Sequence, residues 1–197
     1  ALRAPQTRGR WGEVQLQRVV ELAGMQQHCD FLTQDSTAQE DGSKQRPDLT
    51  VTLTGGRTIF VDSKVPLSSY LDAHDASEPA VIEAKLQAHA KSVKAHVDAL
   101  AKKEYWNQPG LQSPELVVLF IPGEAFLAPA LERDTTLLDA AMEKKVIIAT
   151  PTTLVAMLRT IEFSWRQERL SQNAQKILDL GKEMFDRIQK VSTDFAG

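Results

Sequence analysis

The sequence is poor in the features that mark several large classes of protein. A single cysteine, Cys29, among 197 residues excludes an internal disulfide framework and a cysteine-rich zinc site, and it favours a reducing compartment. No apolar run approaches the roughly 20 residues that a membrane-spanning helix needs, and residues 1–10 lack the apolar middle of a signal peptide. Because the net charge is −3, a DNA-binding surface would require basic residues gathered on one face.

Other absences exclude particular cofactors and catalytic mechanisms. The sequence has neither a Walker-type glycine-rich phosphate loop nor a dinucleotide fingerprint, so no nucleotide cofactor is expected. Ser63 lacks a credible base and oxyanion arrangement, which excludes a serine hydrolase. We expect that this chain makes no membrane contact. The chain begins with Ala1 and soon enters helical sequence, so we expect a piece of a longer protein.

Length and composition favour one compact domain. With 42% hydrophobic residues the chain can bury a core of its own, and a length of 197 residues favours one domain over two. We expect residues 1–197 to form a single domain, with an α/β core over 10–150 and a helical part over 151–197.

Hydrophobic periodicity predicts the order of helices and strands. The polar stretch 33–46 is expected to be a mobile loop, and a bend is expected near Ser164. The predicted helices cover residues 11–24, 78–104, 126–131, 137–144 and 152–191, with a short helix or lid over 67–76; the predicted strands cover 31–32, 49–54, 58–65, 115–121 and 146–149. This order indicates an α/β fold in which a mixed sheet is flanked by helices, with a long C-terminal helical extension.

Two acidic residues and a lysine lie in and around the predicted hairpin. Asp48 follows a proline before the first strand, and Asp62 and Lys64 stand two residues apart on the second, where both project from the same face. Asp48 and Asp62 supply the oxygen ligands that hard divalent cations require, and the Ser63 carbonyl is a possible third. The pattern predicts a Mg²⁺ or Mn²⁺ site, with Lys64 orienting water or stabilising charge on a phosphate.

The hairpin register decides whether Asp48 reaches the face of Asp62, because a shift of one residue moves every side chain across the sheet. A two-residue turn at 55–56 would point Asp48 away from Asp62. A three-residue loop at 55–57 would set Asp48 opposite Lys64 and would pair apolar with apolar residues. Packing favours this second register, although its loop has no glycine at the last position, where the commonest three-residue loop needs one.

The hairpin pattern also has a purely structural interpretation. Asp62 and Lys64 could form a partly buried ion pair, with Asp48 capping a turn. They stand at the end of the apolar strand 59–61, where a charged side chain is uncommon. This position favours the catalytic interpretation.

Asp48 and the Asp62-Ser63-Lys64 run resemble the PD-(D/E)xK pattern of restriction-endonuclease-like nucleases. A broader resemblance is carried by residues 8–16 (Arg-Gly-Arg-Trp-Gly-Glu-Val-Gln-Leu), 46–48, 61–64, 120–124, 150–154, 158–161 and Trp165. Through these segments the chain resembles the RmuC family over nearly its entire length. The resemblance implies a bacterial cytoplasmic protein with a nuclease fold acting in DNA recombination or inversion, usually preceded by a coiled coil and by a helix, absent from this chain, that would tether the full-length protein to the inner membrane. It also implies that an acidic residue on the first helix completes the metal site, a role that Glu13 matches.

The competing interpretation of Glu13 is a first-turn glutamate favoured by the helix dipole. Five further side chains are candidates for lining the site or binding DNA: Gln87, His89, Lys91, Lys94 and Arg159. His89 falls on an apolar stripe, so a buried core histidine competes with a role in the site. The basic residues could hold the DNA backbone without reading sequence, and a solvated helix face competes with that role.

Three functions follow from these features. The first is a Mg²⁺- or Mn²⁺-dependent deoxyribonuclease in which Asp48, Asp62, Lys64 and Glu13 act on a phosphodiester. The second is a non-catalytic DNA-binding or scaffolding domain of the recombination machinery. The third is an oligomerisation module that uses the C-terminal helix over residues 167–191.

Overall fold

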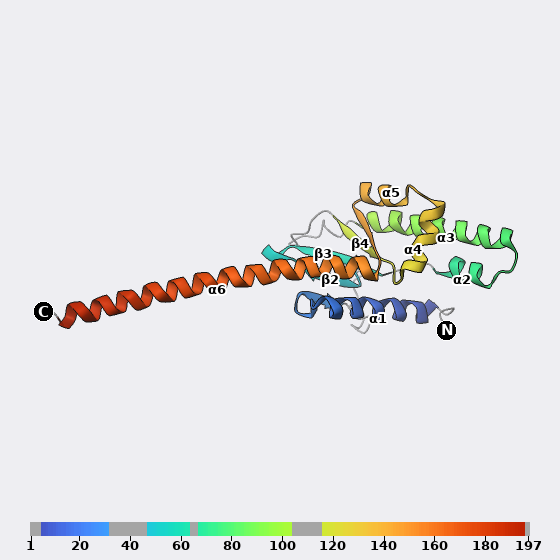
Figure 1. The fold of residues 1–197 in the computed structure, drawn as a ribbon. Coiled ribbons are helices and arrows are strands. Elements are labelled where there is room, and N and C mark those ends of the chain that lie inside the picture. The colour runs from blue at the N-terminus through green and yellow to red at the C-terminus, as the bar shows by residue number, and fades with distance from the viewer. Residues whose placement is uncertain (1–4, 32–46, 64–66, 104–115, 196–197) are drawn as a thin grey trace, which may run out of the picture.

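A computed structural model describes residues 5–31, 47–63, 67–103 and 116–195 (Figure 1). The predicted loop 33–46 and Lys64 lie outside these ranges. The described elements, in chain order, are α1 (Pro5–Ala23), η1 (Gln26–His28), β1 (Cys29–Phe31), β2 (Leu49–Thr52), η2 (Thr54–Gly56), β3 (Thr58–Asp62), α2 (Ser68–Asp75), α3 (Pro79–Ala101), β4 (Val117–Phe120), α4 (Glu124–Arg133), α5 (Leu137–Glu143), β5 (Val146–Ala149) and α6 (Pro151–Phe195).

The described strands form one five-stranded sheet in the order β1-β2-β3-β4-β5. The first three strands pair antiparallel, whereas β4 pairs parallel with β3 and β5 pairs parallel with β4. Each parallel step is bridged by helices, as a parallel connection requires. The predicted mixed sheet flanked by helices is therefore confirmed.

One face of the sheet is covered by α1 and α6, which run side by side in Figure 1. Leu16 and Val20 of α1 and Leu154 and Leu158 of α6 are at most 1% exposed, and they share a buried cluster with Val61 of β3. These helical residues recur at spacings of four, the apolar stripe of an amphipathic helix.

The opposite face is covered by α3, α4 and α5. Val93, Val97 and Leu100 of α3 pack with Phe60 of β3 in a second buried cluster. Because side chains alternate along a strand, Asp62 follows Phe60 onto this face. The end of β3 therefore directs an acidic side chain toward α3.

The β2–β3 register differs from both registers that the sequence suggested. Leu49 pairs with Val61 and Val51 with Ile59, and the three-residue loop is Thr54–Gly56 rather than residues 55–57. Gly56, the last residue of this loop, has φ 76°, a left-handed conformation that suits glycine. The predicted pairing of Asp48 with Lys64 is therefore wrong by two residues. A slip of two keeps each side chain on its face, so the predicted sharing of a face survives.

The end of α1 and the start of α6 are each fixed by residues at the helix terminus. Gly24, at φ 72°, ends α1, and the Met25 amide donates back to the Val20 carbonyl, as in a Schellman motif. At the start of α6, the Thr150 amide donates to the Thr153 hydroxyl and Pro151 occupies the first turn. From there α6 runs unbroken to Phe195, so the expected bend near Ser164 is absent.

None of the described helices combines the length and the apolar character needed to cross a bilayer.

Candidate active site

Asp62 is the most deeply buried acidic side chain of the candidate site, with a side-chain exposure of 1%. Its Oδ2 accepts a hydrogen bond from Lys103 Nζ at 3.0 Å, and its Oδ1 lies 3.7 Å from His96 Nε2. An ionised carboxylate is costly to bury unless cationic or polar groups compensate it. The two basic side chains provide such compensation from the α3 side.

Asp48 lies beside the end of β3. Its backbone amide donates to the Val61 carbonyl at 3.0 Å, and its Oδ2 accepts a hydrogen bond from the Ser63 amide at 2.6 Å. Ser63 is the residue directly after Asp62. The fold therefore brings the two predicted metal-binding carboxylates to neighbouring positions, with Asp48 just before β2 and Asp62 at the end of β3.

Helix α1 packs closely against the same strand end. A Cβ added at Gly12 would lie 2.8 Å from Ser63 Oγ and 3.3 Å from the Ser63 carbonyl oxygen, so only a glycine allows this approach. Glu13, the next residue, is partly exposed and engaged in an interaction of its own. The structure thus places the helix that carries Glu13 against Ser63, the residue that follows Asp62.

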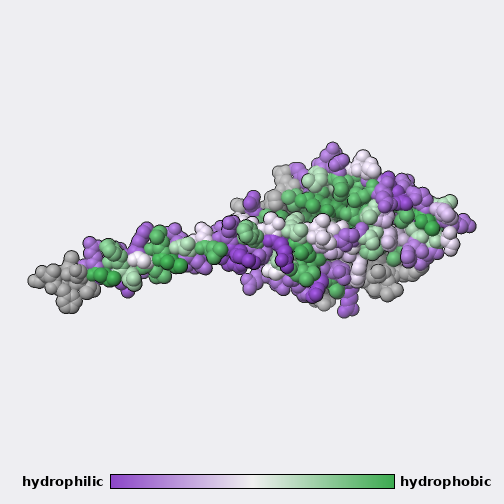
Figure 2. Space-filling model, viewed as in Figure 1, coloured by the Kyte–Doolittle hydropathy of each residue, from purple (hydrophilic) through white to green (hydrophobic). Residues whose placement is uncertain are grey.

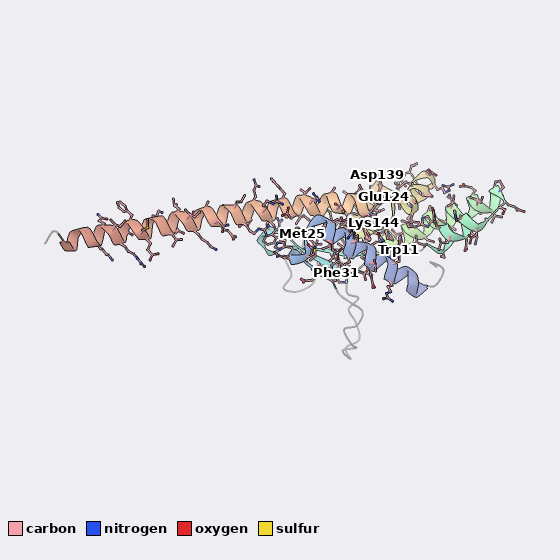
Figure 3. The ribbon with its side chains drawn as sticks, turned by 60° about the horizontal axis from the view of Figure 1, so that its bottom comes forward. Trp11, Met25, Phe31, Glu124, Asp139 and Lys144 are labelled. Atoms are coloured by element: carbon pink, nitrogen blue, oxygen red, sulfur yellow. The ribbon has the colours of Figure 1, made fainter. Side chains whose placement is uncertain are left out.

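An aromatic cluster adjoins this corner of the molecule. The Trp11 and Phe126 rings meet edge to face at 5.8 Å between centroids, and Tyr70 contacts Phe126 at 5.0 Å. Figure 3 marks Trp11 on α1 and Glu124 at the start of α4, the two helices that the Trp11–Phe126 contact joins. The cluster fixes the relative positions of α1, α2 and α4 around the end of the sheet.

His89 belongs to the core beneath this cluster. Its side chain is fully buried, and its Nε2 donates a hydrogen bond to the Phe126 carbonyl at 2.8 Å. Its ring also lies 5.6 Å from that of Tyr70. These contacts match the competing interpretation of a buried core histidine, which positions α4 against α3.

Glu124, at the start of α4, connects the ends of the parallel strands. Its Oε1 accepts hydrogen bonds from the Thr152 amide at 3.1 Å and from the Thr152 hydroxyl at 2.6 Å. The hydroxyl hydrogen bond holds the pKa of the Glu124 carboxyl below its usual value, although partial desolvation opposes this shift. Glu124 therefore caps α6 and ties the segment after β4 to the segment after β5.

The two groups that compensate Asp62 were not predicted as site residues. His96 and Lys103 are seven residues apart, which places them on the same side of a helix two turns apart. Their helical spacing from the buried apolar residues of α3 was the signal in the sequence that could have identified them.

The remaining candidates lie at different places. Gln87 and Lys91 are exposed on α3, and Lys91 is about 200° around the helix from His89. Lys94 pairs with Asp134 at 2.9 Å. Arg159 donates to the Leu22 carbonyl at 3.1 Å, near the end of α1 remote from Gly12. The structure therefore does not gather these four residues around Asp62.

The donor set at the strand end suits a hard divalent cation in its chemistry. Mg²⁺ is commonly held by one or two carboxylates, with waters filling the other positions, and Asp48 and Asp62 are two such carboxylates. Within the described ranges, no group of three or more His, Cys, Asp or Glu side chains is arranged to hold a metal ion. Lys64, the fourth predicted catalytic residue, lies outside those ranges.

The comparisons with known proteins agree on one family. The family model described as "RmuC family" matches residues 1–197. The chain is 47% identical to a "DNA recombination protein RmuC homolog" from Zymomonas mobilis over 95% of its length, and 35% identical to "DNA recombination protein RmuC" from Escherichia coli K12 over 96% of its length. It covers 42% and 40% of those two relatives.

The chain thus spans less than half the length of these curated relatives. No solved structure matches it at a significant level. The match to the family model over the whole chain and the identities to curated relatives lead to one conclusion. This chain belongs to the RmuC family.

Proposed function

We propose that this domain hydrolyses DNA phosphodiester bonds in a reaction that depends on Mg²⁺ or Mn²⁺, and that it does so in DNA recombination. The observation that carries the proposal is the placement of Asp48 beside Asp62, with the Asp48 carboxylate bonded to the amide of Ser63. The names of the relatives, DNA recombination proteins, support the same process for this chain.

Each residue has a role in this proposal. Asp48 and Asp62 hold the cation, assisted by the Ser63 carbonyl, and the metal when bound stabilises the charge that develops on the phosphate. Glu13 assists from α1, and Lys64 orients the attacking water or stabilises charge. Lys103 and His96 face the Asp62 carboxylate from the α3 side and compensate its burial when no cation is present.

The test is cleavage of end-labelled linear, single-stranded and branched DNA with Mg²⁺, Mn²⁺ or EDTA. The parent chain is compared with Asp48→Asn and Asp62→Asn, and with Asp30→Asn as a matched control, since Asp30 is an exposed carboxylate on the edge strand β1. We expect cutting that needs the metal, is lost in the first two variants and persists in the control. Circular dichroism of every variant verifies that the fold is intact.

A second function, DNA binding without cleavage, is favoured by a specific contact. Asp62 is paired with Lys103 at 3.0 Å, an arrangement that also stabilises a fold without any metal. This alternative predicts that DNA is bound equally well in EDTA and is never cut. If Asp62→Asn binds DNA as the parent does and neither cuts it, the scaffolding function replaces the nuclease.

A further inference from the structure

The outer part of α6 extends away from the body of the molecule (Figure 1). Trp165 marks its last contact with the described core, because its Nε1 donates to the Thr52 carbonyl and its ring stacks on His28. All side chains from 166 to 190 are exposed. Figure 2 shows apolar residues recurring along this extension.

The apolar residues of the extension follow a heptad repeat. One set recurs every seven residues, and a second set follows each member of the first by four residues, the alternating spacing of coiled-coil core positions. Within the part of the extension whose side chains are described, the first set is Leu170, Ile177 and Met184, and the second is Ala174, Gly181 and Ile188. The next position of the second set toward the body, Gln167, is polar. Such a stripe stabilises a helix only when another surface covers it.

We propose that α6 pairs with α6 of a second copy of this chain, in an antiparallel coiled coil centred on residue 179. In this arrangement each residue of the first set meets a residue of the second set across the interface. Leu170 meets Ile188 of the second copy, and Met184 meets Ala174 of the second copy. The pairing depends on α6 alone and is independent of the proposed nuclease site.

The sizes of the core residues favour the antiparallel orientation. A parallel pair would set Gly181 against Gly181 and Ala174 against Ala174, which leaves voids in the seam. The antiparallel pair sets Gly181 against Ile177 and Ala174 against Met184, so each small residue faces a large one. Large and small side chains then interdigitate along the seam.

The body of the molecule and the side chain of Leu180 select the register. Centring the pair on residue 179 places Leu178 and Leu180 on either side of the two-fold axis. A shift of one heptad toward the body would bring the described end of the second helix against position 156, beside the buried Leu154 and Leu158. A shift of one heptad the other way would set Leu180 against Arg187 of the second copy instead of near its own counterpart.

The apolar surface is large enough for a stable pair. Seven large apolar side chains of the extension are more than half exposed: Leu170, Ile177, Leu178, Leu180, Met184, Phe185 and Ile188. At roughly 100 Å² for each side chain, two copies would bury on the order of 1,500 Å², within the range of specific protein interfaces. Leu178 and Leu180 flank the two-fold axis, where each lies near its own counterpart.

The first test is the mass in solution, measured by light scattering after size exclusion. We expect about twice the 21.9 kDa of one chain. Ile177→Lys, which puts a charge into the seam, should give the monomer mass, whereas Gln172→Lys, on the outer side of the same helix, should remain a dimer. A monomeric parent, or equal behaviour of the two variants, would overturn the proposal.

The second test is disulfide cross-linking, which separates the two orientations. Leu170→Cys and Ile188→Cys alone should give no covalent dimer, while the double variant should cross-link completely, because each position meets the other in the antiparallel pair. Cross-linking of either single variant with itself would show parallel pairing and overturn this orientation. The parent, whose only cysteine is the buried Cys29, measures the background.

Discussion

Single residues determine how other elements pack against the end of β3. Gly12 permits α1 to approach Ser63, and Lys103 compensates the buried Asp62. Neither role follows from amino-acid type alone, since each depends on a residue more than 40 positions away in the chain. Each contact can be perturbed by a single substitution and compared with the same substitution at a nearby position.

Replacing Gly12 with alanine should destabilise the fold. The new Cβ would lie 2.8 Å from Ser63 Oγ and 3.3 Å from the Ser63 carbonyl oxygen, so the Ser63 side chain must move and the backbone must give by a few tenths of an ångström, at a cost of about 1–3 kcal/mol in unfolding free energy. The control is Gly9→Ala in the same helix, where a Cβ meets nothing within 4 Å and stability should stay level or rise by about 0.4–1 kcal/mol. Urea unfolding of both variants measures the difference, and an equal effect of the two would contradict the proposed close approach.

Replacing Lys103 with methionine should also lower stability, because it removes a cation from a carboxylate that is 1% exposed. The Lys103 side chain is itself 18% exposed, so we expect a loss of about 1–3 kcal/mol, below the cost of breaking a fully buried pair. Lys102→Met, at an exposed neighbouring position, is the control and should change stability by less than about 0.5 kcal/mol. Comparable losses in both variants would show that the Lys103–Asp62 contact contributes little.

At the scale of elements, the sequence was a good guide to which segments form helices and strands. The strand over 146–149 was predicted at its observed bounds, and Gly24 was identified as the end of the first helix. These features depend on local patterns of apolar residues and on backbone conformations that suit glycine or proline. The face occupied by Asp62 was predictable for the same reason.

The hairpin register was not predictable, because several registers pair apolar with apolar residues along β2 and β3. The observed one depends on which glycine takes the last position of the loop, and Gly56 rather than Arg57 does so. The partners of Asp62 were missed for a different reason. His96 and Lys103 reach it from a helix more than 30 residues later, and that contact is a matter of tertiary packing.

The cap of α6 by Glu124 should make stability depend on pH. Because hydrogen bonding lowers the pKa of Glu124 in the folded state, its contribution is fully present above the unfolded pKa, near the ordinary value of 4.5, and is lost as pH falls through the folded pKa. The parent should therefore exceed Glu124→Gln in stability at neutral pH, by less than about 1 kcal/mol for so exposed a group. The gap should close below about pH 4.5.

Unfolding curves of the two proteins between pH 7 and pH 3 measure this gap. Glu143→Gln, which removes an exposed carboxylate from α5, is the control for a general change in charge. A gap between parent and Glu124→Gln that stays constant across this range would exclude the cap as its cause.

At the scale of the whole molecule, α6 has two parts with different roles. Its first part completes one face of the core, since Leu154 and Leu158 are fully buried and Ile161 and Trp165 pack against the same cluster. Beyond Trp165 the described side chains are exposed up to residue 190, so none of them is buried against the body. The folding of the body and the association of copies should therefore be separable by truncation.

Ending the chain after Gln167 should leave the stability of the body unchanged within about 0.5 kcal/mol, because no buried side chain is removed. Ending it after Thr160 should cost about 3–5 kcal/mol, because the second truncation also removes Trp165, which stacks on His28 at 4.2 Å and bonds to the Thr52 carbonyl. Both truncations should be monomeric. Since association stabilises the parent by mass action, the three proteins are compared by urea unfolding at high dilution. Equal losses from the two truncations would show that the body depends on the extension, and that the two parts of α6 act as one.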